Sequence, residues 1–258
     1  MTFNRPLFAT LGVLAVLGAA SFGLSQGAPS AAPKSGPGPA VAVAGEPVLL
    51  ELFTSQGCSS CPPADALAEK LAANPDLVVI ARPVTYWDRL GWKDTLAQES
   101  NTALQQDYAR RGLAGRNGVY TPQLVVNGSY GFVGSHGSEV APSVKQYGAK
   151  SDAAIRVAPA AGGGYAVSLS GTGAGKAELV LVGVTSKVAV SIGSGENGGR
   201  KVTYSNVLRS ERKVGDWAGG KASVTLTASQ LKVPGADRYA LVLRKPGGGQ
   251  VFAAKWVA

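Results

Sequence analysis

The chain has 258 residues, of which 45% are apolar and 16% charged. These values allow two modest domains with buried cores and are typical of a folded protein rather than a disordered one. The formal net charge of +9 is unevenly spread, because residues 47–150 carry 9 Lys and Arg against 9 Asp and Glu, whereas residues 151–258 carry 14 against 6.

The basic second half could attract anionic envelope lipids or other polyanions. A solvated basic surface is the simpler interpretation. The basic residues are scattered and are not interleaved with an aromatic stripe, so nucleic acid is not expected as a partner.

Residues 1–27 have the pattern of a secretory signal peptide. Arg5 supplies the positive charge, residues 7–20 form a short apolar core, and small residues follow. An uncleaved anchor is the alternative, although this run is shorter than the about 20 residues that a spanning helix needs. Residues 28–46 form a linker rich in Pro, Ala and Gly that cannot bury a core. We therefore expect a periplasmic or secreted protein.

The two cysteines of the chain, Cys58 and Cys61, lie where a strand is expected to give way to a helix. Residues 48–53 form an apolar run typical of a buried strand, and Pro62 and Pro63 suit the first turn of a helix. Unpaired N–H groups and the helix dipole stabilise a thiolate at such a helix start. The first cysteine of a C-x-x-C pair placed there can be considerably more acidic than a free thiol.

Structural zinc does not explain this pair. The chain has no second cysteine pair, and His136 is its only histidine, so four Cys and His ligands cannot be assembled. In an oxidising compartment, two such cysteines are expected to cycle between a dithiol and a disulfide. Neither a cofactor nor a resident metal is expected.

The first folded unit is predicted over residues 47–150. Two apolar strands joined by a helix form a β-α-β unit, which favours parallel pairing. Asn127-Gly128 is a hairpin signal between two further strands, and Gly148 is a plausible helix stop. The expected strands are 48–53, 77–80, 124–126 and 130–133, and the expected helices follow Pro62 and cover about 95–111 and 138–147.

A second unit is predicted over residues 151–258. Short segments rich in Val, Leu, Thr and Tyr alternate with Gly-rich turns, a pattern typical of an antiparallel sandwich or barrel. The expected strands are 165–169, 178–184, 187–192, 202–208, 223–226, 239–243 and 251–256.

The order of these features resembles the thioredoxin-like fold. More narrowly, the stretch from Glu51 to Asp65 (ELFTSQGCSSCPPAD), the stretch YTPQLVVNG from Tyr120 and the stretch GENGGRKVTYSNVLR from Gly195 resemble a family of secreted bacterial proteins catalogued as a domain of unknown function. The resemblance implies an α/β thioredoxin-like N-terminal domain followed by an all-β, antiparallel sandwich-like C-terminal domain.

Five residues receive roles from this resemblance. Cys58 would attack a substrate disulfide, and Cys61 would resolve the mixed disulfide. Thr121-Pro122 would be the loop with a cis proline that faces the dithiol and pairs with the substrate backbone. Glu51 would be a buried acid that assists proton transfer to the second cysteine, although one extra residue separates it from Cys58 and could turn its side chain away. The other possibility for Glu51 is a strand-edge carboxylate in water.

The sequence therefore predicts an exported thiol–disulfide oxidoreductase whose partners are protein thiols and disulfides. Ser59-Ser60 between the cysteines suggests an intermediate redox potential. One alternative is a soft-metal module that binds Cu(I) together with a partner's ligands. Another is a scaffold with a redox-inert Cys58–Cys61 disulfide. Trp87 and Trp92 could line a substrate groove or pack under their loop.

Overall fold

The computed structural model describes residues 46–148, 151–173 and 175–257. The expected signal peptide lies outside these residues, as does the expected linker except for Glu46. No helix in the described ranges is long and apolar enough to cross a bilayer. The helices are α1 (Pro62–Leu71), α2 (Glu99–Arg111) and α3 (Val140–Tyr147), with short 3₁₀ turns at η1 (Asp88–Leu90), η2 (Gly137–Glu139), η3 (Ala161–Gly163) and η4 (Ala228–Leu231).

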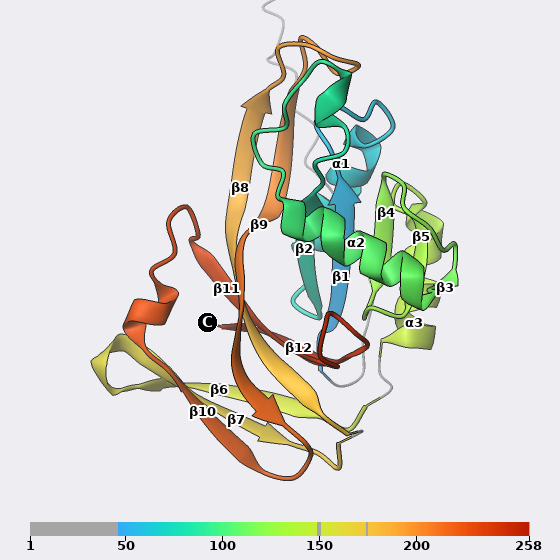
Figure 1. Ribbon diagram of the computed structural model, residues 1–258. Coiled ribbons are helices and arrows are strands. Elements are labelled where there is room, and N and C mark those ends of the chain that lie inside the picture. Colours follow the sequence, from blue (N-terminus) through green and yellow to red (C-terminus); the bar gives the residue numbers. More distant parts are fainter. Residues whose placement is uncertain (1–45, 149–150, 174, 258) are drawn as a thin grey trace, which may run out of the picture. The chain divides into compact units, whose positions relative to one another are not determined.

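A mixed sheet of nine strands, in the order β12-β11-β8-β9-β2-β1-β4-β5-β3, runs through the described part of the chain (Figure 1). A second sheet has the order β10-β7-β6. The strands are β1 (Val48–Thr54), β2 (Leu77–Pro83), β3 (Ala114–Gly115), β4 (Gln123–Val126), β5 (Tyr130–Val133), β6 (Ala154–Ala160), β7 (Gly164–Ser170), β8 (Ala177–Ser191), β9 (Lys201–Trp217), β10 (Ala222–Leu226), β11 (Arg238–Arg244) and β12 (Val251–Val257).

Strand β1 is buried along its whole length, because helices cover both faces of the sheet around it. Successive side chains of a strand point to opposite faces. Leu50 and Leu52 therefore pack with α1 and α3, whereas Phe53 packs with Tyr108 of α2 on the other face. The expected parallel pairing of β1 with β2 is confirmed, as is the hairpin between β4 and β5 at Asn127-Gly128, where both residues have positive φ.

The second half of the chain extends this sheet and also adds a layer to it. Strands β8 and β9 form a long antiparallel hairpin that continues into β11 and β12 on one side. The three-stranded sheet packs against the far end of these strands, and Leu179, Trp217 and Leu241 lie in the core between the layers. On the other side, β9 pairs in parallel with β2 at Ala81 and Val207, which joins the two halves.

The predicted fold class is therefore wrong. The molecule is mostly β, with one mixed nine-stranded sheet and three short helices, and it is not an α/β thioredoxin-like domain followed by a separate all-β domain. The lengths of two strands explain the error. The segments expected at 178–184 and 187–192 are one strand, β8, which continues through an irregularity between Gly183 and Val184. Strand β9 has 17 residues where seven were expected, so it spans both the three-stranded layer and the edge of β2.

Candidate functional site

The two cysteines form a disulfide at the start of α1. Strand β1 ends at Thr54, a turn follows, and Cys61 is the N-cap residue of the helix. Cys58 is 1% exposed and Cys61 is fully buried, whereas Ser59 and Ser60 between them are exposed. The C-x-x-C turn is therefore exposed at its two serines, but the cysteines are covered.

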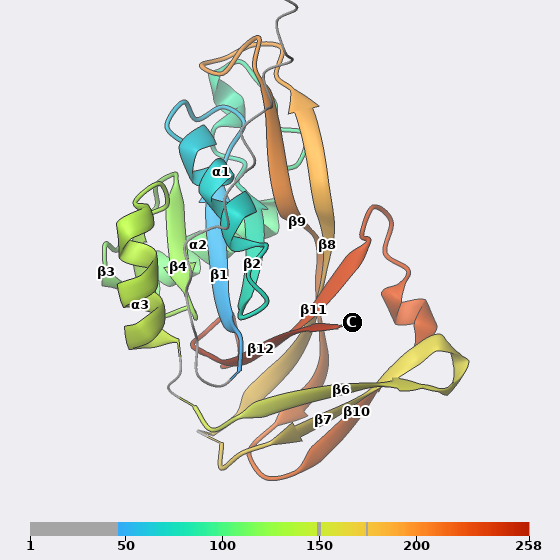
Figure 2. The same ribbon diagram turned by 180° about the vertical axis from the view of Figure 1, so that it is seen from behind.

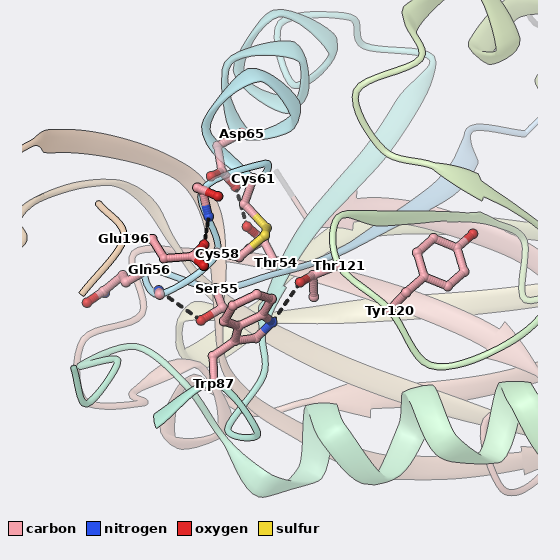
Figure 3. Close-up of a disulfide and its surroundings, with 12 residues drawn as sticks. Thr54, Ser55, Gln56, Cys58, Cys61, Asp65, Trp87, Tyr120, Thr121 and Glu196 are labelled. Atoms are coloured by element: carbon pink, nitrogen blue, oxygen red, sulfur yellow. Dashed lines mark hydrogen bonds between the residues drawn. A yellow bond between two sulfur atoms is a disulfide. The ribbon is translucent and has the colours of Figure 1, made fainter. Parts of the chain in front are cut away.

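The Thr121-Pro122 peptide bond is cis, as the resemblance implies. Thr121 accepts a hydrogen bond of 2.8 Å from the indole nitrogen of Trp87, and Pro122 is buried immediately before β4. Figure 3 shows Thr121 and Trp87 together on one side of the disulfide. A Cβ atom at Gly57 would lie 3.2 Å from Cβ of Trp87, so this ring packs closely against the turn before Cys58.

The structure does not bring Glu51 to the disulfide. Its side chain lies on the α2 face of β1, where Oε1 accepts a 2.7 Å bond from Arg82 and Oε2 a 2.5 Å bond from the Tyr108 hydroxyl. Thr54, the last residue of β1, bonds Asp65 of α1 instead. Glu51 is 1% exposed, so it is not a strand-edge carboxylate in water either.

Asp65, which the sequence reasoning missed, supplies a buried carboxyl on the α1 side of β1, next to the C-x-x-C turn. It lies one helical turn after Cys61, and residues four apart on a helix are neighbours. Its Oδ1 accepts a 2.8 Å hydrogen bond from the Thr54 hydroxyl, while Oδ2 has no hydrogen-bond partner within the described part of the chain. Figure 3 shows this Thr54–Asp65 pair beside Cys61.

Burial raises the pKa of Asp65 to about 8. The hydrogen bond from Thr54 opposes this shift, and the charge of Asp94 adds to it. The carboxyl is therefore protonated over much of the neutral range, when most aspartates are ionised. The i, i+4 spacing from Cys61 was the sequence signal for this residue.

The loop of residues 86–94, called the aromatic loop below, supports the turn before Cys58. Gln56 donates its backbone N–H to Asp94 over 2.8 Å, and its side-chain oxygen accepts a 2.8 Å bond from the indole of Trp92. Burial also raises the pKa of Asp94. Trp92 therefore bonds the turn directly, whereas Trp87 packs against Gly57 of the turn and bonds Thr121.

The second half of the chain covers the C-x-x-C turn. The β8–β9 connection, residues 192–200, is called the hairpin tip below, and both ribbon views place it beside the start of α1 (Figures 1 and 2). Asn197 donates hydrogen bonds to the carbonyl oxygens of Gln56 (2.9 Å) and Cys58 (2.8 Å). Glu196 accepts a 3.0 Å bond from the backbone N–H of Ser59.

Other candidate groups lie apart from this arrangement. His136 is exposed and its Nδ1 lies 3.0 Å from Glu139. Within the residues that the structure describes, no group of three or more His, Cys, Asp or Glu side chains could hold a metal ion.

The chain matches the model of the family described as "Protein of unknown function (DUF1223)" over residues 49–244. The chain belongs to this family. It is also similar to a crystal structure of an Agrobacterium tumefaciens protein determined as a structural genomics target. The two chains are 31% identical with a TM-score of 0.70, and the similarity covers 83% of this chain and 96% of that one. No curated protein matches the chain. The family match includes both the C-x-x-C turn and the hairpin tip.

Proposed function

We propose that this protein is a thiol–disulfide oxidoreductase that acts outside the cytoplasm on protein thiols and disulfides. One observation carries the proposal: the Cys58–Cys61 disulfide begins a helix whose next turn carries Asp65, a buried carboxyl with an unpaired oxygen. Unpaired buried carboxyls are destabilising, so a protein that keeps one beside a disulfide is expected to use its proton. The signal-like pattern of residues 1–27 supports the location, since disulfides persist in oxidising compartments.

The exchange takes place in two balanced steps. A substrate thiolate attacks Sγ of Cys58, the Cys58–Cys61 bond breaks, and Sγ of Cys61 leaves with the bonding electron pair. A second substrate thiolate then attacks the substrate sulfur of the mixed disulfide and releases Cys58 as a thiolate. Two electrons pass from the substrate to the protein, and the substrate leaves as a disulfide. The same steps in reverse reduce a substrate disulfide.

Asp65, positioned by Thr54, donates a proton to Cys61 or accepts one from it. A thiolate leaving into a buried site needs a proton, and Asp65 is protonated at neutral pH because burial raises its pKa to about 8. When the dithiol reacts in the reverse direction, the ionised carboxyl takes the proton back from Cys61. The Thr54 hydroxyl donates to Oδ1 and leaves Oδ2 available for this transfer.

The burial of both sulfur atoms favours a second candidate, a structural disulfide that does not exchange. A short disulfide loop at a helix start would then hold the turn in place for the hairpin tip. The unpaired Asp65 oxygen argues against this alternative, because a purely structural site would be more stable with an apolar residue there.

Two matched variants separate the candidates. Cys58→Ala and Cys61→Ala each remove one sulfur and the same disulfide, so their effects on folding are comparable. Attack at Cys58 predicts that only Cys61→Ala, with Cys58 still present, is trapped as a stable mixed disulfide with a peptide disulfide, and that both variants lose turnover. In the trapping step Cys58 attacks one peptide sulfur, and the other half of the peptide disulfide leaves as a thiolate. Equal trapping by the two variants, or wild-type turnover in either one, would disprove the proposal. Mass spectrometry of the adducts and an insulin-reduction assay give the two readouts.

A further inference from the structure

The hairpin tip reaches the C-x-x-C turn from more than 130 residues away in the sequence, and it bonds the turn on both sides of Cys58. Asn197 is 1% exposed, and its amide bridges the carbonyl oxygens of Gln56 and Cys58. Glu196 is exposed and accepts the N–H of Ser59, the residue that follows Cys58. The side chains of the tip therefore contact the backbone that positions the reactive sulfur.

The tip is preorganised for this contact. Arg200 donates a 3.1 Å bond to Oδ1 of Asn197, which directs the amide nitrogen toward the two carbonyl oxygens. Backbone bonds between Ile192 and Arg200, and between Gly199 and Ile192, close the loop. A Cβ atom at Gly193 would lie 2.9 Å from the Trp92 ring. Because glycine has no side chain, the tip can pack closely against the aromatic loop.

Reduction can produce a negatively charged Cys58 thiolate next to the hairpin tip, where the Glu196 carboxylate is already negative. The backbone N–H groups at the helix start are the donors that stabilise a Cys58 thiolate, and Glu196 occupies the one at Ser59. Hydrogen bonds from Ser59 hold the pKa of Glu196 below its usual range, so this carboxylate is ionised at neutral pH. The thiolate and Glu196 would repel each other and compete for the same donor.

The other charged and titratable groups around the turn do not relieve this conflict. Asp65 of α1 and Asp94 of the aromatic loop are carboxyls, and Tyr204 of β9 lies within the field of both. Arg200 is the cation of the tip, and it is bonded to Asn197.

We propose that the hairpin tip is a redox-responsive clasp, in which Glu196 and Asn197 hold the C-x-x-C turn closed over the disulfide and are released when Cys58 becomes a thiolate. Coupling between two sites is reciprocal. If reduction weakens the clasp, then weakening the clasp favours reduction by the same factor. Opening of the tip would also give a partner access to Cys58. This inference rests on the proposed exchange at Cys58.

Redox equilibrium with glutathione tests the clasp directly. In this reaction two glutathione thiols give two electrons and two protons to the Cys58–Cys61 disulfide and leave as glutathione disulfide. Removing the Glu196 charge stabilises the thiolate, so Glu196→Gln should shift the equilibrium constant toward the dithiol by about threefold, the size expected for one exposed and screened charge next to the turn. Glu196→Ala also frees the Ser59 N–H and should shift it at least as far.

Glu69→Gln is the matched control. Glu69 is partly exposed on α1 and bonds Lys187 of β8 over 2.7 Å, so this change removes the same charge from the same hairpin–helix contact without touching the C-x-x-C turn. The control should leave the equilibrium constant within about 1.5-fold of wild type. No shift in Glu196→Gln, an equal shift in the control, or a disulfide that glutathione cannot reduce in any variant would overturn the proposal.

Hydrogen exchange supplies the reciprocal measurement. Reduction of the wild-type protein with a phosphine should speed amide exchange at Ser59 and in the hairpin tip, with little change in β11. Unchanged exchange at the tip would contradict the clasp. Both measurements use the protein without a partner, so they can fail while catalysed exchange is retained, or succeed while turnover is absent. Failure of the clasp is therefore distinguishable from failure of the proposed function.

Discussion

Two buried polar clusters lie where the first half of the chain packs against the second, and they differ in how completely their groups are paired. Next to α2, Arg82 bonds Glu51 over 2.7 Å and Glu211 of β9 over 2.8 Å, and Arg244 of β11 bonds Glu211 over 2.5 Å. At the start of α1, Asp65 keeps one carboxyl oxygen without a partner in the described residues.

The carboxyl groups of the two clusters therefore differ in their pKa values. Burial opposes the ionisation of Glu211, but the charges of Arg82 and Arg244 outweigh it and hold the pKa of this carboxyl below its usual range. At Asp65 no cation among the described residues offsets burial, which raises the pKa to about 8. Complete pairing fixes charges and stabilises the joint between the halves, whereas incomplete pairing leaves a proton that can move. The first cluster is therefore structural, and the second is the one that the proposed exchange would use.

The largest effect is expected from Arg82→Met. This change leaves the buried Glu51 and Glu211 without their shared cation, and breaking a buried ion pair in this way costs about 3–5 kcal/mol. Urea denaturation monitored by circular dichroism measures the loss of unfolding free energy.

Arg110→Met is the control, because Arg110 pairs with Asp107 on the exposed surface of α2. It should cost less than about 1 kcal/mol. Comparable losses in the two variants would show that the buried cluster does not stabilise the joint.

A smaller effect of the opposite sign is expected from Asp65→Asn. The folded protein holds a proton on Asp65 between its ordinary pKa of 3.8 and about 8, where the unfolded chain has lost it. Wild-type stability therefore falls as the pH rises through this window, and the full penalty is present above it. Asparagine can still accept from Thr54 without carrying a charge.

The Asp65→Asn protein should thus be more stable than wild type by about 2–4 kcal/mol above pH 8 and no more stable near pH 4. Thermal denaturation across this pH range measures the difference. Thiol–disulfide exchange should become slower in the same variant, since Cys61 loses its proton donor. A variant with the wild-type pH slope, or with unchanged exchange, would remove Asp65 from the mechanism.

The smallest stability effect is expected from Asn197→Ala. Two buried carbonyl oxygens lose their donor, which should cost about 1–2 kcal/mol in the disulfide form. The clasp predicts a smaller cost in the dithiol form. Ser194→Ala, which removes an exposed bond from the same tip to Gly91, should have little effect in either form. Equal costs in the two redox forms would show that the tip does not respond to reduction.

The local elements could be predicted from the sequence because their signals are local. Pro62 and Pro63 correctly mark the start of α1, and Asn127-Gly128 correctly marks the β4–β5 hairpin. The position of the disulfide follows from the same signals.

The joining of the halves could not be predicted, because it depends on tertiary contacts. β-Propensity places residues 202–208 in a strand but does not show that β9 continues to Trp217 or pairs with β2. The sequence places Asp65 four residues after Cys61, one helical turn away, but aspartates on helices are usually exposed. Its burial becomes visible only once β9 packs against α1. Glu51 failed as a candidate because strand alternation turns it toward Arg82.

The most direct test of the exchange chemistry is the rate at which glutathione reduces the Cys58–Cys61 disulfide in the folded protein and in the same protein unfolded in urea. A site built for exchange accelerates reduction, because Asp65 protonates Cys61 as it leaves in the first step and the helix start stabilises the Cys58 thiolate released in the second. We therefore expect faster reduction in the folded protein at neutral pH. Slower reduction in the folded protein would mean that the fold only shields the disulfide, and would contradict the account.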